Sequence, residues 1–136
     1  MKRYLLFIIV LHSACQASYE KKAAETDCNK FKKGRFFHQS QGDPTIYKIE
    51  RTDSIQTEII GKTGDFVKLK IRWTGPCTYE LTFLNQHMYS MDSISESLQK
   101  SLKVKVEITN VRNDTCFVIT DNGSQQLPGI VYIDKK

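Results

Sequence analysis

Histidine and cysteine are the side chains in this sequence that are most able to carry acid–base or covalent chemistry. The chain has three His and four Cys. An imidazole titrates near neutral pH, so His38 and His87 are the candidates for a general base. No Gly-x-Ser-x-Gly motif, phosphate-binding loop or Gly-x-Gly-x-x-Gly motif accompanies them. We therefore predict that the protein is not an enzyme, and a hydrolase that uses His38 or His87 is the weakest alternative.

The sequence indicates that the acidic and basic residues lie on a solvated surface. The carboxylates of Glu50 and Glu58 lie on neighbouring predicted strands, but nothing in the sequence brings them to the separation that paired acid–base catalysis needs. Lys68, Lys70 and Arg72 alternate with apolar residues along one predicted strand, which indicates a basic outer face. We expect all five side chains to face water.

The first residues have the layout of a secretory signal peptide. Lys2 and Arg3 precede a short apolar run at 4–11, and small residues follow it. This run is too short to cross a bilayer, which takes about 20 residues. Without Lys2 and Arg3 the chain has 18 basic and 15 acidic residues, so its net charge is only +3. This modest charge, together with export, gives no reason to expect a nucleic-acid partner.

Two ways of processing this signal stay open. Ser13-Ala14-Cys15 resembles the end of a bacterial lipobox, which predicts a lipid on Cys15 and an anchor in the bilayer of the cell envelope, on the outer membrane or its periplasmic face. His12 stands where a lipobox usually has Leu. The alternative is cleavage after Ala17, which would give a soluble periplasmic or secreted protein. We expect a signal peptide at 1–14, a flexible tether at 15–27 and a single domain at 28–136.

Three cysteines lie beyond Cys15, and an odd number in an oxidising compartment suggests one disulfide and one free thiol. Cys28 and Cys77 both fall at the ends of predicted elements, where a bond is easily made, so we predict that they are joined. Cys116 lies within a predicted strand, and we expect it to be buried and inert.

Cysteine and histidine also share one spacing that could suggest metal ligands. Cys28 and His38 are ten residues apart, and so are Cys77 and His87. No known metal-binding mechanism requires that spacing, and export favours a disulfide over thiolate ligands. We predict no metal ion and no other cofactor.

The rest of the chain has the period-2 alternation of half-buried strands. The clearest strands are predicted at 67–73, 79–83 and 103–109. Weaker ones are predicted at 35–39, 46–51, 55–60, 116–120 and 130–133. Short turns, several with Gly or Asn-Gly, separate them and force antiparallel neighbours. One segment differs, because apolar residues recur at helical spacing there and predict a helix over 92–101.

These elements predict an all-β fold, an antiparallel meander of about eight strands that curls into a lipocalin-like barrel or half-barrel with one helix. A barrel of this size either holds a small ligand or is filled by its own side chains. Aromatic residues on the predicted strands are the candidates to line a ligand site: Phe36, Trp73, Tyr79, Phe83 and Phe117.

Residues 28–36, with the pattern Cys-x-x-Phe-Lys-x-Gly-x-Phe, resemble the opening of a family of small lipoproteins from Gram-negative envelopes. The resemblance continues at 51–58, at Trp73 and at 77–82, and so covers most of residues 28–84. Some relatives carry a DNA topoisomerase IV label. This chain is too short for a topoisomerase subunit, and an exported protein does not act on chromosomal DNA. The family is largely uncharacterised, so the resemblance implies an envelope location and a β fold but no activity. Gly34-x-Phe36 is also faintly similar to the Gly-x-Trp opening of lipocalins.

Two non-enzymatic functions are therefore open. The first is an envelope protein that binds a small apolar or amphipathic ligand. The second is a structural or protein-interaction lipoprotein with a solid barrel and a partner that the sequence does not identify. An unfilled cavity would favour the first.

Overall fold

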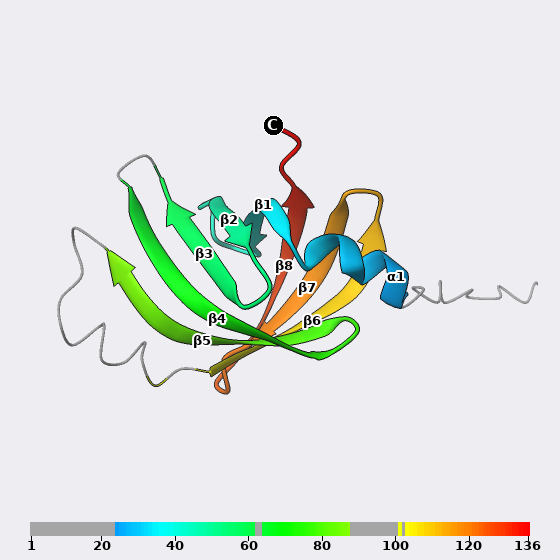
Figure 1. The fold of residues 1–136 in the computed structure, drawn as a ribbon. Helices are drawn as coiled ribbons and strands as arrows, with labels where there is room; N and C mark the ends of the chain where they lie inside the picture. Colours follow the sequence, from blue (N-terminus) through cyan, green and yellow to red (C-terminus); the bar gives the residue numbers. More distant parts are fainter. Residues whose placement is uncertain (1–23, 62–63, 88–100, 102) are drawn as a thin grey trace, which may run out of the picture.

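The computed structural model describes residues 24–61, 64–87, 101 and 103–136 (Figure 1). A short helix α1 (Glu25–Cys28) and a 3-10 turn η1 (Asn29–Phe31) precede eight strands. The strands are β1 (Gly34–Ser40), β2 (Tyr47–Arg51), β3 (Ile55–Ile60), β4 (Asp65–Gly75), β5 (Thr78–His87), β6 (Lys103–Arg112), β7 (Thr115–Asp121) and β8 (Gln126–Ile133).

The strands form one closed barrel in which each pairs antiparallel with the next and β1 pairs with β8. The all-β meander predicted from the sequence is confirmed, and of its two forms the protein adopts the full barrel. Closure gives each strand a paired neighbour on both sides. Residues 92–100 of the predicted helix lie outside the described residues.

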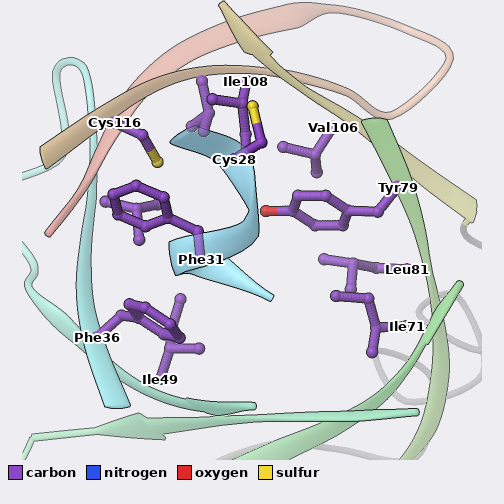
Figure 2. Packing of buried hydrophobic residues seen from close by; sticks show 12 residues of the cluster. Cys28, Phe31, Phe36, Ile49, Ile71, Tyr79, Leu81, Val106, Ile108 and Cys116 are labelled. Carbon is purple, nitrogen blue, oxygen red and sulfur yellow. The ribbon is translucent and has the colours of Figure 1, made fainter. Parts of the chain in front are cut away.

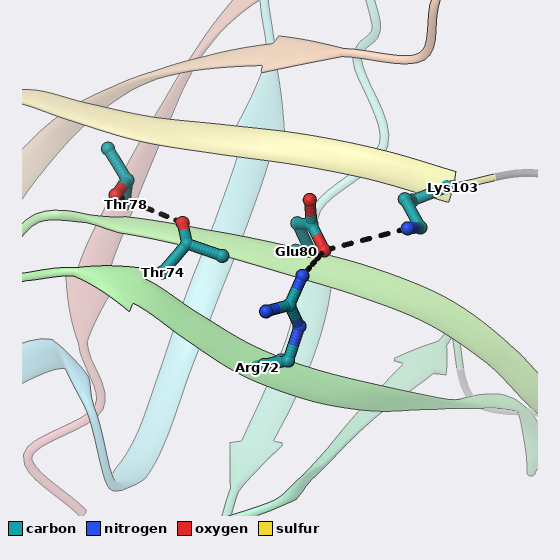
Figure 3. Close-up of polar contacts among 5 residues, drawn as sticks. All are labelled: Arg72, Thr74, Thr78, Glu80 and Lys103. Carbon is teal, nitrogen blue, oxygen red and sulfur yellow. Dashed lines mark hydrogen bonds and ion pairs between the residues drawn. The ribbon is translucent and has the colours of Figure 1, made fainter.

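Alternation along each strand sorts the side chains between the interior and water. On β4, Leu69 and Ile71 face inward, whereas Lys68, Lys70 and Arg72 are exposed as expected. The outward side chains form ion pairs on the outer face of β4, β5 and β6, where Glu80 is joined to Arg72 and Lys103 (Figure 3). The hydrogen bond from Arg72 is the main cause of a lowered pKa at Glu80. Because these pairs are solvated, they add little to stability.

The N-terminal turns close one end of the barrel. Phe31 and Cys28 are fully buried there, and α1 lies beside β6 (Figure 1). Figure 2 shows η1 surrounded by side chains of the barrel, and the Phe31 and Phe36 ring centroids are 5.8 Å apart. We call α1 and η1 together the plug. It begins within the 15–27 range that was expected to be a tether.

The predicted disulfide is present. Cys28 of the plug is bonded to Cys77 in the β4–β5 turn, across a sequence separation of 49 residues. Cys116 is free and fully buried, as expected, and burial raises the pKa of its thiol to about 12. Cys116 is therefore protonated at neutral pH and a poor nucleophile.

Replacing both Cys28 and Cys77 with Ser should lower the free energy of unfolding by about 2–5 kcal/mol, because the unfolded chain regains the freedom of a long loop. Urea unfolding without reductant measures this loss. With reductant present, wild type and the double variant should unfold alike. A difference between oxidised wild type and the variant below about 0.5 kcal/mol would contradict a stabilising disulfide.

Candidate functional site: the barrel cavity

The barrel contains a cavity of about 490 Å³, a volume within the range of about 300–1,000 Å³ seen for small-molecule sites. At one end the cavity is lined by Arg51, which donates a hydrogen bond to the plug, and by Tyr79, which is hydrogen-bonded to Arg51. From there it extends toward the opposite end of the barrel. Its lining comes from all eight strands: His38, Ser40, Tyr47, Ile49, Arg51, Gln56, Glu58, Ile60, Val67, Leu69, Tyr79, Leu81, Phe83, Val104, Val106, Val118, Thr120 and Val131, with Asp43 from the β1–β2 connection.

The cavity has two chemically different walls. Strands β1, β2 and β3 contribute the mainly polar wall: His38, Ser40, Tyr47, Arg51, Gln56 and Glu58, with the apolar Ile49 and Ile60. Strands β4 to β8 contribute the mainly apolar wall: Val67, Leu69, Leu81, Phe83, Val104, Val106, Val118 and Val131, with the hydroxyl-bearing Tyr79 and Thr120. Alternate residues of a strand point to the same face, so each wall is built from every second residue. A molecule with one polar edge and an apolar body matches this division.

Arg51 is the main charged group of the polar wall, and only 5% of its surface is exposed. Its Nε donates to Gln56 Oε1 at 2.7 Å, and its terminal nitrogens donate to the Phe31 carbonyl at 2.8 Å and to the Tyr79 hydroxyl at 2.7 Å. The guanidinium carbon also lies 5.3 Å from the centre of the Phe36 ring and 4.8 Å from that of Tyr79. All these partners are electrically neutral.

Glu58 is the acidic group that is joined to this network through Gln56. The amide of Gln56 donates to Glu58 Oε1 at 2.7 Å, so Gln56 links the carboxyl to Arg51. Burial raises the pKa of Glu58, and the Gln56 hydrogen bond and the Arg51 charge oppose this rise only in part. The carboxyl therefore holds its proton to a higher pH than an ordinary Glu.

His38 and Asp43 lie farther from the plug. Burial and the charge of Arg51 lower the pKa of His38, against a smaller opposing effect of Asp43, so the imidazole is neutral at neutral pH. The ring needs glycine opposite it, because a Cβ at Gly129 would lie 2.9 Å from His38 Nε2. Asp43 accepts a hydrogen bond from the Tyr47 hydroxyl at 3.2 Å. Its pKa is lowered, mainly by hydrogen bonds from Thr45.

The aromatic residues named from the sequence do not all reach this cavity. Tyr79 and Phe83 line it. Phe36 packs against Phe31 of the plug. The centroids of the Trp73 and Tyr79 rings are 4.7 Å apart, and the Lys32 ammonium lies over the face of the Trp73 ring.

Phe117 faces the outside of the barrel, because its neighbours Cys116 and Val118 are the inward residues of β7. It lines a separate depression that also includes Pro128 and Ile130.

The interpretation of Glu58 as a surface residue is wrong, and the roles of Arg51 and Gln56 were not anticipated. On β3 the polar residues Gln56 and Glu58 point inward, while Ile55 and Ile59 occupy the alternate positions. This reverses the usual hydrophobic pattern. The signal that could have revealed it was the matching alternation of polar residues at 56 and 58.

The candidate catalytic and metal-binding residues from the sequence are not brought together. His38 lines the cavity, whereas His87 lies at the end of β5 with its ring centroid 6.0 Å from that of Phe66. Cys28 and Cys77 are engaged in the disulfide. Among the described residues, no group of three His, Cys, Asp or Glu side chains could hold a metal ion.

Comparison with known proteins gave no match: no family model, curated protein or solved structure is significantly similar to this chain. The resemblance to envelope lipoproteins stays a prediction. In the part of the chain that the structure describes, no helix has the length and apolar character needed to cross a membrane.

Replacing Glu58 with Gln should stabilise the fold at neutral pH. The folded protein keeps the Glu58 proton at a pH where the unfolded chain, with a pKa of about 4.5, has released it. The stability of wild type should therefore fall as the pH rises from this value through the raised pKa of the folded state. The amide removes that slope. Urea unfolding at several values between about pH 4 and pH 8 measures the gain.

Glu50→Gln is the control, because Glu50 is exposed on the neighbouring strand β2. It should give no comparable gain. A Glu58→Gln protein less stable than wild type at neutral pH would contradict a raised pKa at Glu58.

Proposed function

We propose that the protein binds a small amphipathic molecule inside its barrel and does not transform it. The observation that carries this proposal is the cavity of about 490 Å³ with a polar wall on β1–β3 and an apolar wall on β4–β8. Burying an apolar body against the second wall provides the driving force, at about 25 cal/mol for each Å² of apolar surface removed from water. The polar wall orients the molecule.

The chemistry of the cavity supports binding more than catalysis. His38 lines the cavity, but among the described residues no nucleophilic side chain is hydrogen-bonded to its imidazole. Cys116 carries a protonated, buried thiol. A solid barrel with a structural or protein-interaction role is the alternative, and the cavity argues against it.

Filling the cavity should abolish this binding. Val104→Trp places a large side chain on the apolar wall, because Val104 lines the cavity. Lys105→Trp is the matched control, since Lys105 is the next residue of β6 and is exposed. With the neutral fluorescent probe N-phenyl-1-naphthylamine, we expect Val104→Trp to weaken binding at least about tenfold, or about 1.4 kcal/mol. Circular dichroism should show both variants folded.

Probe binding that is equal in both variants would place the probe outside the cavity. Absence of saturable binding to wild type would favour the solid-barrel alternative and end the ligand-binding proposal in this form.

We also infer that the protein is held at the bacterial envelope by a lipid on Cys15. The support is the order of charge, apolar run and Ser13-Ala14-Cys15 in the sequence. Cys15→Ala should move the protein from the membrane fraction to the soluble fraction of a Gram-negative host. Cys116→Ala removes the other unpaired cysteine and should leave fractionation unchanged. Membrane association of Cys15→Ala equal to wild type would rule out this anchor.

A further inference from the structure

Arg51 carries a buried charge and forms no direct ion pair with an acidic side chain among the described residues; Glu58, which interacts with it electrostatically, is linked to it through Gln56. Its three side-chain hydrogen bonds go to an amide oxygen, a backbone carbonyl and a phenol. The ion pairs of the described residues involve other side chains and lie on the outer surface. A buried charge without a counter-ion is costly, so this arrangement favours an anion brought from outside.

The titratable groups around Arg51 come from four strands, and the pKa shift of each favours its neutral form. On β1, His38 has a lowered pKa, and on β3, Glu58 has a raised one. On β5 and β7, Tyr79 and Cys116 have raised pKa values, chiefly because they are buried. Arg51 is thus the cationic group of the cavity wall, and the Asp43 carboxylate, whose pKa is lowered, lies farther from the plug.

The guanidinium also has capacity left for a ligand. A guanidinium has five N–H donors, and the hydrogen bonds of Arg51 to Gln56, Phe31 and Tyr79 use three of them. The remaining donors belong to the terminal nitrogens of a side chain that lines the cavity. A carboxylate is the planar anion whose two oxygens suit such donors best.

We propose that the ligand is a monocarboxylic acid with an apolar chain, its carboxylate against Arg51 and its chain along the apolar wall of β4–β8. This inference rests on the proposed function and specifies the chemical class of the ligand. Glu58 refines the same site. While it is protonated it leaves the positive charge of Arg51 to the ligand, whereas its anion would repel a carboxylate head.

A matched pair of probes tests the head group without any mutation. Dodecanoate and 1-dodecanol have the same chain length, and each is titrated against N-phenyl-1-naphthylamine bound to the full chain at pH 7. The alcohol leaves water more readily than the carboxylate, so the chain alone cannot favour the acid. We expect dodecanoate to displace the probe at a concentration at least about tenfold lower.

Arg51→Gln should remove this preference while dodecanol binding persists. Lys48→Gln is the control, because Lys48 lies on the same strand, is paired with Glu50 on the outer surface, and carries the same charge. It should keep the preference. Circular dichroism establishes that each variant is folded.

If Arg51→Gln does not fold, the carboxyl carbon of ¹³C-labelled dodecanoate bound to wild type gives an independent reading. Its NMR signal should stay at the ionised position to a lower pH than that of the free acid, because Arg51 stabilises the anion. Titration of the bound acid at or above the pH of the free acid would overturn the inference.

The outcomes separate the two proposals. Binding of dodecanol and dodecanoate with equal affinity would overturn the carboxylate site and leave the amphipathic cavity intact. An unchanged preference in folded Arg51→Gln would do the same. Failure of both amphiphiles and of N-phenyl-1-naphthylamine to bind would overturn the proposed function itself.

Discussion

The guanidinium of Arg51 connects parts of the fold that are far apart in the sequence. From β2 it reaches Gln56 on β3, Tyr79 on β5 and the Phe31 carbonyl in the plug. Removing any one of these neutral partners would leave a buried donor unsatisfied, which typically costs about 1–3 kcal/mol. This one side chain therefore links the plug to the polar wall and supplies the positive charge of the cavity.

The cavity exists because the side chains in part of the barrel interior are too small to fill it. An eight-stranded barrel is just wide enough for its own side chains to fill. Here large rings gather near the plug, where Phe31, Phe36 and Tyr79 are buried (Figure 2). Farther along, the apolar wall consists mainly of Val and Leu, which extend less far toward the opposite wall. Space is therefore left between this wall and the polar one.

The sequence predicted the parts of the fold that follow the ordinary hydrophobic pattern. Strands β4, β5 and β6 were clear, because apolar inward residues alternate with polar or charged outward ones along most of their length. The disulfide followed from the positions of Cys28 and Cys77. Strand β3 hid its role, since a polar inward face looks like a solvated face until closure of the barrel encloses it. Closure of the barrel places Glu58 inside. No local sequence pattern reveals that Arg51 contacts partners as distant in the sequence as Phe31 and Tyr79.

The Cys28–Cys77 bond also determines how the molecule would respond to a mechanical load. Tension applied to the two ends of the chain passes through this covalent bond and bypasses residues 29–76. Strands β1 to β4 lie wholly inside that bypassed loop, and with them Arg51, Gln56 and Glu58. Pulling would thus load β5 to β8, which follow Cys77, while the disulfide would limit the extension of the segment that carries the polar wall.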